Sequence, residues 1–113
     1  MLNGIIGKKT VYIVTGYTDM RKGIDGLAAI VQGKLLLDPY SKALFLFCGK
    51  NPHKLKGLLW EGDGFLLLSK RLENGKYRWP RNEYEALELS EQQLRWLLEG
   101  LEIEQKKAIK LGK

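Results

Sequence analysis

Residues 54–80 read KLKGLLWEGDGFLLLSKRLENGKYRWP, and this stretch has the pattern of a β-meander. It contains two tight-turn signals, one at Gly62-Asp63-Gly64 and one at Asn74-Gly75. Asn-Gly is the strongest short hairpin signal, because a type I′ turn needs positive φ at both central residues. The runs between the turns are rich in apolar residues, and a proline ends the last run. The stretch therefore predicts an antiparallel meander with strands at about 54–61, 65–73 and 76–79.

The same turns predict which side chains share a face of the meander. A two-residue loop at 74–75 pairs Arg71 with Arg78, and the alternation of a strand then separates two faces. One face is apolar and carries Leu55, Leu59, Leu66, Leu68, Leu72 and Tyr77. The other face carries five cations, Lys54, Lys56, Arg71, Lys76 and Arg78. Because facing like charges destabilise a sheet, this face is either suited to an anion such as phosphate or simply solvated.

Three further residues extend the cationic face. Lys50 lies in the loop that precedes the meander, and Trp60 and Phe65 continue the face toward the turn at 62–64. The two rings either stack on nucleic-acid bases or pack beneath a loop, and the sequence leaves both readings open. His53 in the same loop has no second ligand nearby in the sequence, so we expect a surface or packing residue there.

The rest of the chain predicts two helices and further strands. Residues 11–14 and 43–48 are typical of strands, and 85–89 of a short edge strand. The first helix carries an apolar stripe with Thr18 or Asp19 as N-cap, and the second begins at a capping box, Ser90 with Gln93. Their stripes are Met20, Ile24, Leu27 and Val31, and then Leu94, Leu97, Leu98 and Leu101. We expect an α+β fold: a mostly antiparallel sheet, with a central meander of three to four strands and two helices on one face.

Length and charge narrow the class of protein. The chain has 113 residues and a formal charge of +6, which fits one globular domain, expected at 1–104 and followed by a basic, flexible tail at 105–113. Residues 42–81 carry a net charge of +6 and residues 82–104 a net charge of −6, so an anionic partner is expected for residues 42–81.

No run approaches the roughly 20 apolar residues of a membrane span, and no signal peptide is evident. Cys48, the single cysteine, is predicted to be a buried thiol. A free thiol suits a reducing compartment, so we expect a cytoplasmic location.

Signals for catalysis are poor. The sequence has no Ser-His-Asp or Cys-His arrangement with a local signature, and no cofactor motif. Asp19, Glu61 and Asp63 are the carboxylates that a metal-dependent nuclease would use, but turn chemistry already accounts for Asp63. We therefore expect a protein that is not an enzyme and binds no metal, and the role of these three carboxylates stays open.

Six blocks of sequence resemble a known family. The blocks are TDMRKGIDGLA at 18–28, LFLF at 44–47, WEGDGF at 60–65, KRLENG at 70–75, YRWP at 77–80 and QLRWLLEGL at 93–101. In this order they resemble TnpB, the accessory protein of the insertion-sequence-sixty-six (IS66) family of bacterial transposable elements. The resemblance implies a small protein encoded beside a larger transposase and needed for full transposition, with no catalytic site to carry over. Many members have an arginine-rich loop with an Asp before the second central strand, where this chain reads GKNPHK at 49–54.

Two functions from different classes follow. The first is a non-catalytic accessory factor of transposition that binds DNA through Lys54, Lys56, Arg71, Lys76 and Arg78, with Lys50 beside them. The alternative is a protein adaptor that docks the transposase through the acidic segment or the helix of Trp96, with little DNA affinity of its own. DNA and the transposase are the expected partners, and the sequence does not fix the oligomeric state.

Overall fold

The computed structural model describes residues 9–81 and 84–104. Five strands and three helical segments make up this part of the chain. They are β1 (Val11–Val14), α2 (Ile24–Ala29), the π-helical segment η1 (Ile30–Lys34), β2 (Leu44–Cys48), β3 (Lys54–Trp60), β4 (Phe65–Arg71), β5 (Ala86–Leu89) and α3 (Glu91–Leu98). The segment predicted as a basic tail, 105–113, lies outside the described residues.

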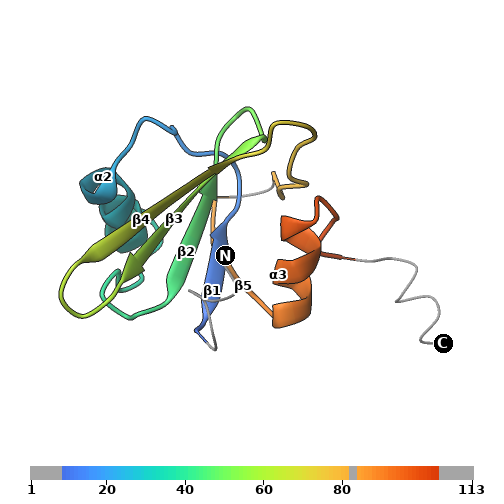
Figure 1. Ribbon diagram of the computed structural model, residues 1–113. Helices are drawn as coiled ribbons and strands as arrows, with labels where there is room; N and C mark the ends of the chain where they lie inside the picture. The colour runs from blue at the N-terminus through green and yellow to red at the C-terminus, as the bar shows by residue number, and fades with distance from the viewer. Residues whose placement is uncertain (1–8, 82–83, 105–113) are drawn as a thin grey trace.

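The strands form one mixed sheet in the order β4-β3-β2-β1-β5 (Figure 1). β1 and β2 are parallel, and the other three neighbouring pairs are antiparallel. The α+β class and the predominance of antiparallel pairs are as predicted. The parallel pair arises because α2 and η1 lie between β1 and β2 in the chain, and a crossover of this kind brings the next strand back in the same direction.

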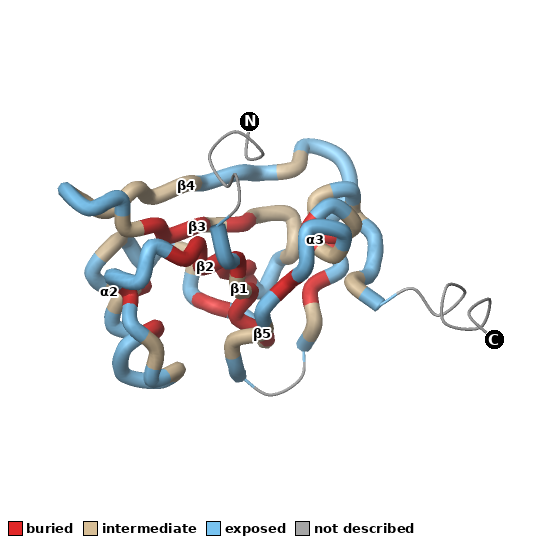
Figure 2. Tube along the Cα trace, turned by 90° about the horizontal axis from the view of Figure 1, so that it is seen from below, coloured by how far each residue is buried: buried red, intermediate tan, exposed pale blue. Residues whose placement is uncertain are grey.

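The two helices cover opposite faces of the sheet, so the prediction that they share one face is wrong (Figures 1 and 2). Leu27 of α2 belongs to a buried cluster with Phe45 and Phe47 of β2. Leu97 of α3 belongs to a second cluster, which contains the alternate β2 residues, Leu44 and Leu46. The physical reason lies in β2, where all five residues are apolar and buried and each face of the strand needs its own cover. We call the two sides the α2 face and the α3 face.

The predicted apolar face of the meander is largely correct. Leu55, Leu59 and Tyr77 are buried on the α3 face, and Leu66, Leu68 and Leu72 pack against the same cluster. In the first hairpin, Trp60 pairs with Phe65 and Lys54 pairs with Arg71. Even residues of β3 therefore share a face with odd residues of β4, as predicted.

The third strand of the meander, predicted at 76–79, does not form. Gly75 has a positive φ of 87° but Asn74 does not, so the two residues are not a type I′ turn. Instead the Tyr77 N–H donates to the Pro52 carbonyl at 2.7 Å, and the Trp79 indole N–H donates to the Val14 carbonyl at 2.8 Å. Burial of these two large rings on the α3 face outweighs the local hairpin signal.

The two predicted helix starts have different outcomes. The capping box is confirmed: the Ser90 hydroxyl accepts from the Gln93 N–H at 3.1 Å, and the Gln93 side chain accepts from the Ser90 N–H at 3.0 Å. α2 instead begins after Gly23, without a side-chain cap, so neither Thr18 nor Asp19 is its N-cap. Within the described ranges, no helix is long and apolar enough to cross a membrane.

Candidate nucleic-acid interface

Three of the predicted cations lie together where β4 ends and β3 begins. Lys54 and Arg71 are directly opposite each other, and Lys56 lies on the same side, two residues along β3. This side is the α2 face, because Leu58 of β3 and Leu67 of β4 pack into the α2 cluster. The Lys56 ammonium donates to the Lys22 carbonyl at 2.9 Å, which joins the strand to the loop before α2.

Two loops meet beside these cations. The Thr18 N–H donates to the Cys48 carbonyl at 2.8 Å, and Met20 packs on the backbone of Gly49. A Cβ at Gly49 would lie 2.6 Å from the Met20 Cγ, so a residue without a side chain is needed for this approach. Between the loops lies an open pocket of about 440 Å³, lined by Tyr17, Thr18, Asp19, Met20, Gly49, Lys50, Asn51, His53 and Lys54.

Asp19 is held by its neighbour Arg21 and not by a helix. The Arg21 Nη2 lies 2.8 Å from Oδ2 and the Arg21 Nε lies 3.0 Å from Oδ1, while the Arg21 backbone N–H also donates to Oδ1 at 2.9 Å. These bonds hold the pKa of Asp19 well below its usual range, so the carboxylate is charged at neutral pH. Asp19 therefore lines the pocket as a carboxylate whose negative charge is balanced by Arg21.

Arg81 fixes the relative position of the two loops. Its guanidinium donates to the Gly16 carbonyl and to the Gly49 carbonyl, both at 2.8 Å. It also lies 5.6 Å from the centre of the Tyr17 ring. Arg81 was not among the predicted site residues, because its acceptors are backbone carbonyls that no sequence pattern marks.

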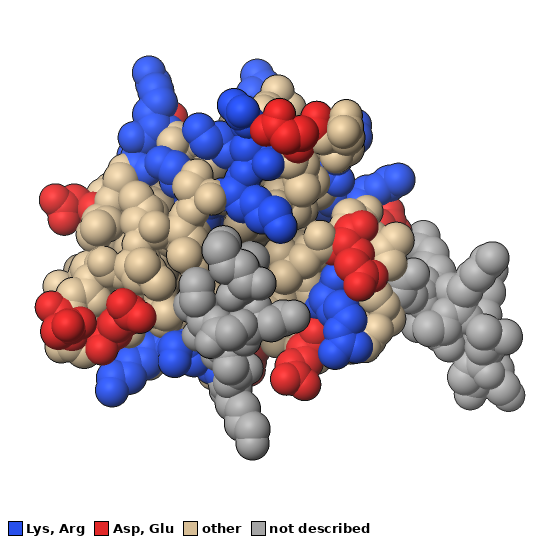
Figure 3. Space-filling view, viewed as in Figure 1, with Lys and Arg blue, Asp and Glu red and all other residues tan. Residues whose placement is uncertain are grey.

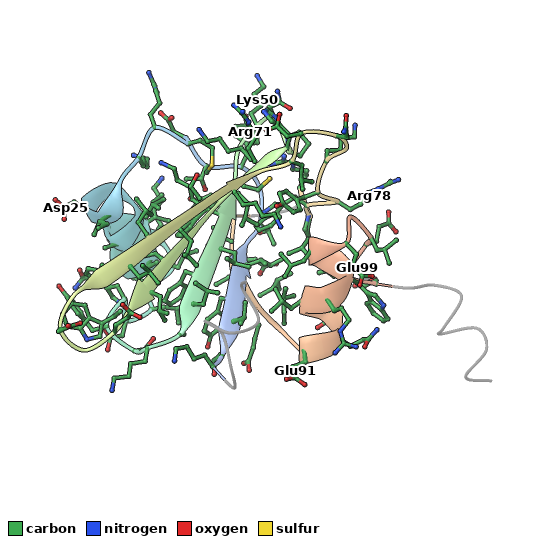
Figure 4. All side chains as sticks on the ribbon, viewed as in Figure 1. Asp25, Lys50, Arg71, Arg78, Glu91 and Glu99 are labelled. Atoms are coloured by element: carbon green, nitrogen blue, oxygen red, sulfur yellow. The ribbon has the colours of Figure 1, made fainter. Side chains whose placement is uncertain are left out.

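These contacts define a continuous basic surface, which we call the basic end. It contains six cations, Arg21, Lys22, Lys50, Lys54, Lys56 and Arg71. It contains two carboxylates, Asp19 and Glu73, each paired with an arginine at 2.8 Å and 3.1 Å respectively, so its net charge is +4. Figure 3 shows lysine and arginine side chains gathered along the upper part of the molecule, and Figure 4 places Lys50 and Arg71 there. Arg21 and Lys22 were not predicted as binding residues from the sequence, where they stood only in the block at 18–28 that resembles the family.

The other two predicted cations, Lys76 and Arg78, do not lie on a strand of the sheet. Arg78 lines a second pocket, of about 340 Å³, together with Trp79, Leu87 and Ile103. The Lys76 carbonyl lies beside Gly100, just after α3. The five-cation face is therefore wrong for Lys76 and Arg78, because the segment that carries them turns toward α3 and does not pair with β4 (Figure 4).

Trp60 and Phe65 pack beneath a loop, which is one of the two readings that the sequence left open. Their ring centres are 4.9 Å apart, and Tyr40 packs on both, at 4.9 Å from Trp60 and 5.3 Å from Phe65. The three rings lie at the far end of β3, six residues from Lys54, which is about 20 Å along a strand. They are separate from the basic end.

The carboxylates considered for a metal do not converge. Glu61 and Asp63 flank the β3–β4 turn, whereas Asp19 lines the pocket with Lys54 at the opposite end of β3. In the described ranges, no group of three or more His, Cys, Asp or Glu residues is placed to hold a metal ion.

Comparison with known proteins identifies relatives over most of the chain. The family model described as IS66 Orf2 like protein (TnpB_IS66) matches residues 9–108. Two proteins of Sinorhizobium fredii are similar. Uncharacterized protein y4hO is 42% identical over 92 residues, covering 81% of this chain and 80% of its own length. Uncharacterized protein y4jC is 36% identical over 92 residues, covering 81% of this chain and 79% of its own length. No solved structure matches.

Proposed function

The chain belongs to the IS66 Orf2-like family of transposition-associated accessory proteins, and from this premise we propose that it binds DNA through the basic end. In this proposal the protein is non-catalytic, acts in the cytoplasm, and holds the phosphate backbone of an element's DNA while the transposase performs the chemistry. The observation that carries the proposal is the net charge of +4 on one continuous surface built from two loops and two strands.

The character of the cations supports phosphate contact. Lys50 and Lys54 form no ion pair within the described ranges, and both side chains border the open pocket. Their ammonium groups are therefore available to an anion, whereas Arg21 and Arg71 each share their charge with a carboxylate. Phosphate contacts of this kind position a protein on DNA without reading its sequence.

The shape of the surface favours contact with the DNA backbone and not with base edges in a groove. The basic end consists of strand ends and loops, and α2 has only six residues. A helix that inserts in the major groove is the usual device for reading base edges. We therefore expect affinity for DNA with little sequence preference.

A binding titration with matched variants tests the proposal. Fluorescence anisotropy of labelled duplex and single-stranded DNA at low salt should show binding by the wild-type chain and much weaker binding by the Lys50→Ala/Lys54→Ala variant. The control is Lys34→Ala/Lys42→Ala, which removes the same charge from two exposed lysines outside the basic end. Equal loss in both variants would indicate a response to net charge alone, and no binding at low salt would refute the proposal.

The alternative function, an adaptor that docks the transposase, is favoured by a different surface. Glu91 at the start of α3 and Glu99 at its C-cap are exposed, and the nearby 340 Å³ pocket has apolar walls from Trp79, Leu87 and Ile103. Acidic and apolar groups together suit a basic, apolar peptide segment. Capture of the transposase that is abolished by Glu91→Lys/Glu99→Lys, in a chain without DNA affinity, would establish this function in place of the first.

A further inference from the structure

β4 is the edge strand of the sheet, and its outer side is uncovered among the described residues (Figure 2). The strand has seven residues, and its register with β3 runs without a bulge from Lys54 opposite Arg71 to Trp60 opposite Phe65. It contains no proline, and its charges are confined to the last two residues, Lys70 and Arg71. Natural edge strands are usually shortened, bulged or charged along their length to prevent pairing. β4 lacks most of this protection.

The hydrogen bonds that flank the hairpin establish which backbone groups point outward. The Leu72 N–H donates to the His53 carbonyl at 2.8 Å, and the Glu61 N–H donates to the Gly64 carbonyl at 2.9 Å. Hydrogen-bonded positions alternate along an antiparallel pair, so the even residues of β4 are bonded to β3. The N–H and C=O groups of the odd residues therefore face outward, and none has a backbone partner in the described ranges: Phe65, Leu67, Ser69 and Arg71.

The side chains at this edge are apolar on both faces. Leu66 and Leu68 are half-buried against the α3 cluster, and Phe65 and Leu67 are half-buried against the α2 cluster. On each face of the sheet, the apolar side chains that run across the strands thus end at β4, where they are partly exposed to water. One more strand would continue both rows and remove this area from solvent.

We propose that the strand added to β4 is β4 of a second copy, paired antiparallel about Leu68. In this register Phe65 faces Arg71 of the partner, Leu67 faces Ser69, and the two Leu68 side chains face each other. All four outward residues on each chain then exchange hydrogen bonds, two for each facing pair. Shifting the register by one residue would place outward groups opposite inward ones, so none of these bonds would form.

Charge supports a second copy as the occupant. In the centred register Arg71 lies opposite the Phe65 ring and Lys70 lies opposite Leu66, so no two like charges face each other. The strand is therefore complementary to itself, as a two-fold interface requires. The axis runs perpendicular to the continuous sheet, so the two α2 faces lie on the same side. The two Arg71 positions are six residues apart, about 20 Å, which places both basic ends on one surface.

A cysteine cross-link tests the register. Facing residues that are not hydrogen-bonded have Cα atoms about 4.5 Å apart, within the range of a disulfide. Leu68→Cys should give a disulfide-linked dimer on mild oxidation of the full chain. Leu66→Cys, on the same face and also half-buried, should not, because its copies lie four residues out of register. The wild-type chain is the second control, since its only cysteine, Cys48, is buried.

Sedimentation velocity tests the pairing without oxidation. The wild-type chain should sediment with twice the 12.9 kDa mass of one chain as concentration rises. Ser69→Pro, which removes one outward N–H and no bond to β3, should stay monomeric, whereas Ser69→Ala should still dimerise. A chain that is monomeric at every concentration and gives no Leu68→Cys cross-link would overturn the proposal, as would a dimer that survives Ser69→Pro or links through Leu66→Cys. Circular dichroism confirms that each variant is folded.

Discussion

Lys54 lies directly opposite Arg71 at the end of the β3–β4 pair, so two positive charges face each other on adjacent strands. Facing like charges destabilise a sheet, and no carboxylate in the described ranges pairs with Lys54. In the proposed complex, a DNA phosphate between the two side chains would relieve this repulsion.

The first prediction concerns this repulsion. Lys54→Gln should raise the free energy of unfolding by a few tenths of a kcal/mol, roughly the scale of one cross-strand charge pair. Lys70→Gln is the matched control, because Lys70 is on the same strand pair but faces Leu55. Urea denaturation of the three proteins measures the effect. A loss of stability in Lys54→Gln alone would mean that Lys54 has a favourable partner and that the two charges do not repel.

The second prediction concerns the two faces of the sheet. Leu58 and Leu59 are adjacent in β3, both buried, and belong to the α2 and α3 clusters respectively. Leu58→Ala and Leu59→Ala should each lower the free energy of unfolding by about 2–5 kcal/mol. Leu36→Ala should be nearly neutral, because Leu36 is 81% exposed. A small effect at Leu58 would show that α2 does not cover its face.

The third prediction concerns the segment after Asn74-Gly75. The Trp79 indole donates to the buried Val14 carbonyl, so Trp79→Phe leaves that carbonyl without its partner. The expected loss is about 1–3 kcal/mol of unfolding free energy, measured by urea denaturation. Trp96→Phe provides the comparison, because the Trp96 indole has no such bond in the described part of the chain and its loss should be smaller. Equal stability of Trp79→Phe and wild type would argue that this segment does not pack as described.

The fourth prediction concerns Cys48. Burial raises the pKa of the Cys48 thiol from 9.0 to about 11. The folded state therefore keeps its proton more tightly than the unfolded state, and this contribution to stability is complete below pH 9 and lost as the pH rises toward 11. A thiol reagent should react with the native chain very slowly at pH 8 and rapidly after unfolding. Cys48→Ala should lack this part of the pH dependence. Rapid reaction of the native chain at pH 8 would contradict the burial.

The strand features that depend on local chemistry could be predicted from the sequence. The turn at 62–64 and the alternation of β3 and β4 correctly placed Lys54, Lys56 and Arg71 on one side. The Asn74-Gly75 signal failed because burial of Tyr77 and Trp79 on the α3 face competes with the hairpin. The cover of both faces follows from the uninterrupted apolar run of β2. Such a run indicates burial on both sides of a strand, but from the sequence it was used only to predict a strand.

The basic end itself could be predicted only in part. Lys50, Lys54, Lys56 and Arg71 follow from strand register and the adjoining loop. Arg21 and Lys22 join them through the Lys56 bond to a backbone carbonyl, and Arg81 acts through two further carbonyls. Every residue carries such a carbonyl, so only the tertiary fold reveals which one a side chain reaches.

The salt dependence of DNA binding tests whether the basic end contacts DNA phosphates. Contact with four or five phosphates gives a slope of log K against log salt concentration of roughly −4 on duplex DNA. Lys50→Ala/Lys54→Ala should make the slope shallower by about 2, while Lys76→Ala/Arg78→Ala, which removes the same charge on the α3 side, should leave it unchanged. Equal slopes for wild type and Lys50→Ala/Lys54→Ala, or a loss confined to Lys76→Ala/Arg78→Ala, would contradict the assignment of DNA binding to the basic end.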